Sequence, residues 1–148
     1  MWQIILLSII TYGIDSQVVM EPTGTLVVNI ENIHLNKGSI HIALYDDPTT
    51  FSKDEGVFFG EIIQLKQAGS QQWIVEDLSY RKYALAIFHD INSNGKMDRN
   101  LLGVPKEPYA FSKKEPSKWR EPTFQDVAFQ MNAPEKKINV SLDFWKDR

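Results

Sequence analysis

Cysteine is absent from this sequence of 148 residues. Its absence excludes disulfide bonds, a cysteine-ligated zinc site and a thiol nucleophile, so stability must come from packing or from a hard metal ion. Basic residues are not in excess either, because 16 Lys and Arg stand against 19 Asp and Glu and give a formal net charge of -3. The chain as a whole therefore has no electrostatic footprint for nucleic acid or for an anionic membrane surface, and we expect no nucleic-acid partner.

Long apolar runs are also missing. The apolar stretch near the N terminus is far shorter than the roughly 20 residues that a membrane-spanning helix needs. A short apolar stretch followed by small and polar residues is typical of a secretory signal peptide, which we place at residues 1–16. We therefore expect export to the periplasm or the extracellular space, without stable membrane insertion once the signal is removed. The alternative is a buried first strand, because isoleucine-rich sequence also favours strands.

The rest of the chain shows the period of two that is typical of β-strands. Apolar side chains alternate with their neighbours in residues 26–30 and 40–44, which predicts two strands joined as a hairpin by the turn at residues 36–38. The same reasoning predicts further strands at residues 57–65, 72–76, 83–89 and 138–144.

Helical periodicity is scarce in comparison. Thr123 is suited to cap a short helical turn that leads into Val127. Six or seven short strands separated by turns predict an all-β fold. We expect one domain at residues 17–148, a single antiparallel β-sandwich of about seven strands, immunoglobulin-like or transthyretin-like, with one long loop.

That long loop, residues 89–120, contains the densest chemistry of the chain. Its first part has oxygen-bearing side chains at relative positions 1, 3, 5 and 9 and Gly95 at position 6, the spacing by which a loop wraps its ligands around calcium. The candidate ligands are the side chains of Asp90, Asn92, Asn94 and Asp98 and the main-chain carbonyl of Lys96. We therefore predict a calcium ion as cofactor.

The loop is not an EF-hand. Leu101 occupies position 12, where an EF-hand has a bidentate Glu, and no helical pattern flanks the loop. Glu107, between two prolines that restrict the backbone, is our candidate for a distal ligand. The alternative is a metal-free turn in which the Asn and Asp side chains bind their own backbone and Gly95 supplies a positive φ.

Catalytic motifs are not evident. The sequence has no G-x-S-x-G, P-loop or H-E-x-x-H pattern. His89, beside Asp90 and near Glu107, has a setting suited to a general base or to a transition-metal ligand. One alternative is therefore a hydrolase-like enzyme that uses His89 and Glu107. The other interpretation of His89 is a strand-end residue hydrogen bonded to a loop carbonyl, which we favour because one His without a spaced partner makes neither a triad nor a zinc site.

Aromatic residues give the competing functional class. Tyr109, Phe111 and Trp119 lie in the long loop, where exposed aromatics can stack on sugar rings or anchor a peptide. They can equally form a satellite core under the loop. We therefore expect a binding or envelope-associated accessory module with a protein or glycan ligand, and no enzyme.

Two long runs of the sequence, residues 83–98 and 102–112, closely resemble the bacterial family catalogued as domain of unknown function 2141. The resemblance also includes residues 26–33, 37–40 and 122–129 and so extends over most of the chain. It implies an exported bacterial protein, and the family has no assigned activity.

Overall fold

The computed structural model describes residues 20–117 and 119–148 of the chain. The signal peptide expected at residues 1–16 lies outside the described residues. Within the described part, no helix has the length and apolar character needed to cross a membrane.

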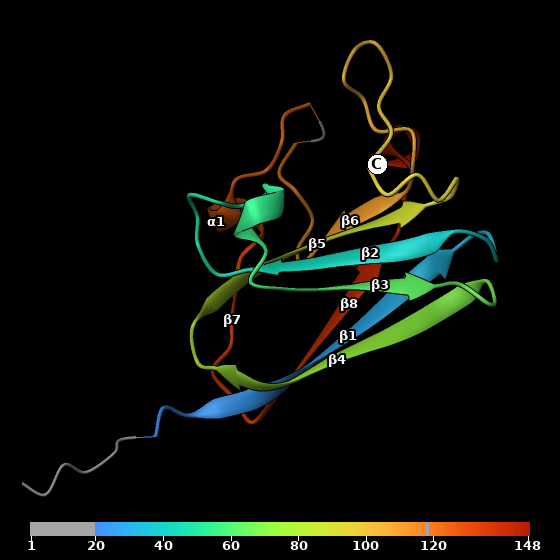
Figure 1. The fold of residues 1–148 in the computed structure, drawn as a ribbon. Coiled ribbons are helices and arrows are strands. Elements are labelled where there is room, and N and C mark those ends of the chain that lie inside the picture. Colours follow the sequence, from blue (N-terminus) through green and yellow to red (C-terminus); the bar gives the residue numbers. More distant parts are fainter. Residues whose placement is uncertain (1–19, 118) are drawn as a thin grey trace, which may run out of the picture.

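Eight strands in the described residues form two sheets that face each other (Figure 1). The smaller sheet has the order β4 (Gly69–Ser79), β1 (Thr23–Ile33), β8 (Glu135–Ser141). The larger sheet has the order β3 (Phe59–Gln64), β2 (Ser39–Tyr45), β5 (Lys82–Asp90), β6 (Tyr109–Phe111), and β7 (Phe129–Gln130) pairs with β5. The predicted all-β sandwich is confirmed.

Alternation of side chains builds the core between these sheets. Leu26, Val28 and Ile30 of β1 are fully buried, and so are Ile40 and Leu44 of β2. Successive side chains of a strand point to opposite faces, so the alternate residues of each strand enter the core together. The apolar side chains that alternate in the sequence are therefore the ones that face the core.

The predicted hairpin between residues 26–30 and 40–44 is wrong. β1 pairs with β4 and β8, whereas β2 pairs with β3 and β5, so the two strands belong to different sheets. The connecting segment crosses from one sheet to the other. Alternation shows which face of a strand is buried, but it does not specify the partner strand.

The turn in this crossover depends on Gly38. Its φ is +76°, and a Cβ at this position would collide with the carbonyl oxygen of Asp90. Only glycine combines the left-handed backbone with such a close approach. The turn residue therefore fixes the start of β2 beside the end of β5.

One strand pair departs from the expected antiparallel arrangement. β1 and β8 are parallel along seven residue pairs, from Thr25 with Glu135 to Glu31 with Ser141. The other ladders of the two sheets are antiparallel. Parallel strands need a long crossover, and nearly the whole chain separates β1 from β8.

A second, smaller core covers part of the outer face, the face of the larger sheet that is turned away from the first core. The helix α1 (Phe124–Val127) buries Phe124 and Val127 there against Tyr45 and Ala84. Thr123 caps this helix, as the sequence predicted, because its hydroxyl accepts a hydrogen bond from the Asp126 backbone N–H. The helix leaves another part of the outer face uncovered, and a cavity lies there.

Two short 3-10 turns complete the fold. They are η1 (Asp54–Gly56) and η2 (Trp145–Asp147). Together with the segments before and after β6, they line the part of the outer face that α1 does not cover.

Candidate functional site

Asp90 ends β5 and organises the loop that follows. Its side chain is almost completely buried, and its two carboxylate oxygens accept hydrogen bonds from the backbone N–H groups of Asn94 (3.2 Å) and Gly95 (2.8 Å). Gly95 has a φ of +81°, which allows the chain to reverse at this point. The first residue of the predicted calcium loop is therefore connected to its fifth and sixth.

The side chains of Asn92, Asn94 and Asp98 converge on one point of the loop. The amide nitrogens of Asn92 and Asn94 donate to the two carboxylate oxygens of Asp98, at 2.6 and 3.0 Å. These hydrogen bonds, the Asn94 one foremost, hold the pKa of Asp98 below its usual value. Three of the predicted ligands thus lie in direct contact.

The same asparagines form turns with the backbone. The side-chain oxygen of Asn92 accepts the N–H of Asn94, and that of Asn94 accepts the N–H of Lys96, at 3.1 and 3.0 Å. These are the Asx turns of the metal-free alternative. Among the described residues, no group of three or more His, Cys, Asp or Glu side chains is arranged to hold a metal ion.

Glu107 returns to the loop from a distance of nine residues. Its side chain is buried, and its carboxylate accepts the backbone N–H groups of Ile91 (2.9 Å) and Asp98 (3.1 Å). The structure therefore brings Glu107 to the predicted site, where it fastens both ends of the loop through their backbone. Residues 90–98 and Glu107 form one hydrogen-bonded unit.

The two histidines at this end of the sheet have different surroundings. His89 is buried on the core side of β5, and its Nε2 lies 2.8 Å from the Lys37 carbonyl oxygen. His41 lies on the outer face, where it stacks on Phe88 with ring centroids 4.6 Å apart and approaches Asp90 at 3.4 Å. The sequence pattern predicts a strand at residues 40–44, which includes His41, but indicates no functional role for this residue. Strand register links His41 to the loop. His41 pairs with Phe88, and Ser39, two residues earlier on the same strand, pairs with Asp90.

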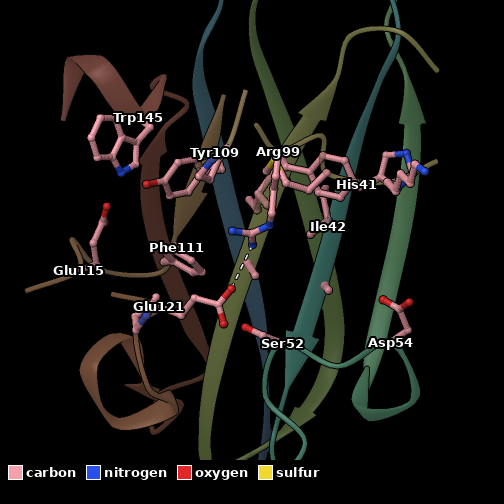
Figure 2. Close-up of a pocket in the computed structure, with 18 of the residues that line it drawn as sticks. His41, Ile42, Ser52, Asp54, Arg99, Tyr109, Phe111, Glu115, Glu121 and Trp145 are labelled. Carbon is pink, nitrogen blue, oxygen red and sulfur yellow. Dashed lines mark hydrogen bonds and ion pairs between the residues drawn. The ribbon is translucent and has the colours of Figure 1, made fainter. Parts of the chain in front are cut away.

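A cavity of about 850 Å³ opens on the outer face of the larger sheet (Figure 2). We call it the outer cavity. Small residues line the strands beneath it, namely Ala43 on β2, Gly60 on β3 and Ala86 on β5. Its walls come from η1, from the segment 95–105 and from residues in the ranges 115–117 and 119–122. Short side chains along the middle of a sheet face leave room for a ligand of drug size.

Aromatic side chains form one wall of the outer cavity. Tyr109 is buried, and Phe111 packs against the second core while it lines the cavity. Trp119 is 79% exposed and meets Trp145 edge to face at 5.0 Å. The aromatic residues of the long loop therefore divide between a satellite core and an exposed wall. Trp145 lies near the C terminus, outside the long loop, and no sequence pattern links it to this wall.

Charged side chains cross the same cavity. The Arg99 guanidinium pairs with Glu121 at 3.1 Å and also donates to the Gly103 carbonyl oxygen at 2.9 Å (Figure 2). This pair joins two loops that come before and after β6. Because both side chains are substantially exposed, it contributes little to stability, and a ligand can replace it at small cost.

Glu115, which lines the outer cavity, makes a buried ion pair with Arg148. The Arg148 guanidinium contacts both carboxylate oxygens of Glu115 at 2.7 Å and lies 4.1 Å from the centroid of the Tyr109 ring. Burial raises the pKa of the Tyr109 hydroxyl. The pair fixes the C terminus against β6 and was not predicted from the sequence.

The residues of the hydrolase alternative do not meet in this cavity. Neither His89 nor Glu107 lines it, since both are buried and hydrogen bonded to backbone groups. The His89 geometry matches the strand-end interpretation, in which the ring binds a loop carbonyl.

Most of this chain matches a known protein family. Residues 28–139 match the model of a family described as "Uncharacterized protein conserved in bacteria (DUF2141)". The chain belongs to this family. The DUF2141 match begins inside β1 and ends inside β8, so it includes the loop at residues 90–98 and the lining of the outer cavity except Trp145. No curated protein and no solved structure gives a significant match.

Proposed function

We propose that this DUF2141 protein is an exported, non-enzymatic binding module whose outer cavity receives a glycan. The observation that carries the proposal is the outer cavity itself, with an aromatic wall on one side and charged side chains across it. Sugars present C–H faces that pack on aromatic rings and hydroxyl groups that hydrogen bond to carboxylates and guanidinium groups. The hydrolase alternative lacks comparable support, because its two residues lie outside the cavity.

Particular residues supply these two kinds of contact. Trp119 offers an exposed ring that Trp145 holds from the side. Asp54, Arg99 and Glu121 offer polar groups around the same space (Figure 2). Arg99 and Glu121 neutralise each other and are both substantially exposed, so an uncharged hydroxyl-rich ligand can hydrogen bond to their remaining polar atoms while the ion pair stays intact.

The test is binding to an array of oligosaccharides from bacterial envelopes, followed by titration of a bound sugar. Trp119→Ala should weaken binding about ten-fold, equivalent to about 1.4 kcal/mol, because it removes the exposed ring. Ile74→Ala is the matched control, since Ile74 is half exposed on the other sheet and should leave affinity unchanged. Capture of peptides but not of sugars would contradict the glycan assignment.

Calcium is the second part of the proposal, as a structural ion of the loop at residues 90–98. The alternate oxygen-bearing residues support it, and so does the contact of Asp98 with Asn92 and Asn94, because an ion there would replace amide donors as the partner of the carboxylate. Each asparagine would then turn its side-chain oxygen toward the ion. The Asx turns of the metal-free alternative occur in the same loop, so only an ion titration separates the two interpretations.

A further inference from the structure

The segment between β5 and β6 contains a narrow turn, residues 99–105, that we call the leucine finger. In Figure 1 this segment, gold in colour, extends away from both sheets. Leu101 and Leu102 at its tip have relative exposures of 106% and 87%, the highest among the large hydrophobic side chains of the described residues. A single exposed leucine is ordinary, but an adjacent pair at the tip of a projecting turn indicates a contact surface.

Hydrogen bonds make the leucine finger stiff. Arg99 and Pro105 form a β-bridge at its base, and the backbone N–H of Asn100 donates to the Val104 carbonyl at 2.9 Å. The side-chain oxygen of Asn100 accepts the N–H groups of Leu102 (2.9 Å) and Val104 (3.0 Å). The two leucines are therefore presented in an ordered turn, so a partner would not have to order the backbone when it binds.

Charge around the leucine finger differs from that of the whole chain. The chain has a formal net charge of -3, but residues 96–106, which include the leucine finger, contain three Lys and Arg against one acid, Asp98. Lys96 and Lys106 are exposed on either side of the leucine finger. The tip thus combines apolar side chains with a positively charged surround.

We propose that the leucine finger docks on the surface of an anionic phospholipid bilayer. Leu101 and Leu102 enter the boundary between headgroups and acyl chains, and Lys96 and Lys106 lie near the lipid phosphates. Two leucines and a few lysines give reversible, peripheral binding and no insertion across the bilayer.

The shape of the tip favours a bilayer over a second copy of the chain. A stable protein interface buries about 1,200–2,000 Å² with fitted surfaces, and a two-leucine convex tip provides only a small part of that area. A fluid bilayer needs no fitted surface, because its headgroups move aside around an apolar side chain. The lysines match anionic headgroups in charge.

The test is flotation of the full chain with vesicles of phosphatidylcholine, with and without phosphatidylglycerol. We expect binding to the anionic vesicles that weakens as salt is raised, because the lysine contribution is screened. The double variant Leu101→Ser with Leu102→Ser should bind at least about ten-fold more weakly, since both apolar side chains are removed from the tip. Ile74→Ser, on the opposite sheet, is the matched control and should bind like the wild type.

Every variant keeps the same N-terminal segment, so differences between them report on the leucine finger alone. Unchanged vesicle binding by the double variant would overturn the proposal, and so would equal binding to vesicles without phosphatidylglycerol. A dimer in solution that the double variant dissociates, with no vesicle binding by the wild type, would instead place the leucine finger in a subunit interface. Leu102 lines the outer cavity but Leu101 does not, so the single variant Leu101→Ser leaves the cavity lining intact. It should weaken vesicle binding without changing glycan binding, and the two proposals therefore fail or succeed independently.

Discussion

Asp98 shows how single side chains set the properties of the loop. Its carboxylate has two amide donors, from Asn94 and Asn92, and its pKa is lowered as a result. A lowered pKa in the folded protein means that the carboxylate contributes stability above its ordinary pKa, and that this contribution is lost as pH falls through the lowered value. The charge that calcium would need is therefore present throughout the neutral range.

Calcium should raise the melting temperature if the loop binds it only in the folded protein. At about ten times Kd the gain is about 1.4 kcal/mol, worth a few degrees in a domain of this size. Asp98→Asn should abolish the shift because it removes a ligand charge, whereas Lys113→Ala, outside the candidate ligands, should preserve it. Magnesium should have less effect, because a flexible loop of several oxygens suits the larger ion. A melting curve and calorimetric signal that calcium leaves unchanged in the wild type would establish the metal-free turn.

Asp90, the first candidate ligand, is less suitable for this test than Asp98. Its carboxylate is buried and accepts two backbone N–H groups, so its removal would leave buried donors without a partner. Loss of ion binding in Asp90→Ala would therefore be mixed with damage to the loop. Asp98 is less buried than Asp90, and its carboxylate accepts only side-chain amides. Asp98→Asn therefore tests ion binding with less damage to the loop.

At the scale of elements, α1 decides how much of the outer face remains open. The helix has only four residues, so its stability depends on burial of Phe124 and Val127 and on its N-terminal cap. Asp126 accepts the Thr123 N–H at 2.7 Å and pairs with Arg120 at 2.7 Å. This ion pair, with the Thr123 hydrogen bonds, lowers the pKa of Asp126 far below its usual value, so the cap weakens only in strong acid.

Thr123→Ala should destabilise the protein by about 1 kcal/mol, because it removes the hydroxyl that caps α1. We expect the melting temperature to fall by about 3–6 °C, measured by calorimetry or circular dichroism at neutral pH. Gln125→Ala, an exposed position of the same helix, is the control and should leave the melting temperature unchanged. Equal melting temperatures for Thr123→Ala and the wild type would show that packing alone holds α1 in place.

At the scale of the whole molecule, the predicted export determines which lipids and glycans the protein can meet. A short apolar stretch followed by polar residues is typical of a cleaved signal. Protein recovered from the native organism should therefore begin after about residue 16, as measured by its intact mass. A full-length cytoplasmic species would contradict export and support the alternative of a buried first strand.

The sequence by itself located six of the strands and the chemistry of individual segments, but not the short strands β6 and β7. The alternation in residues 26–30 and 40–44 identified buried faces, because the side-chain period of a strand is local. Thr123 identified the cap of α1, and the spacing from Asp90 to Asp98 identified a closed, oxygen-rich loop, because these contacts join residues only a few positions apart.

Only the tertiary structure decided which strands pair and which distant side chains meet. β1 and β2 are neighbours in the sequence but lie in different sheets, and β8 joins β1 in parallel. The outer cavity brings His41, Arg99 and Trp145 together across about a hundred residues, and Glu115 in its lining pairs with Arg148. Such contacts depend on the packing of two sheets and on which loops cover the remaining face, and no local pattern of side chains encodes the choice of partner.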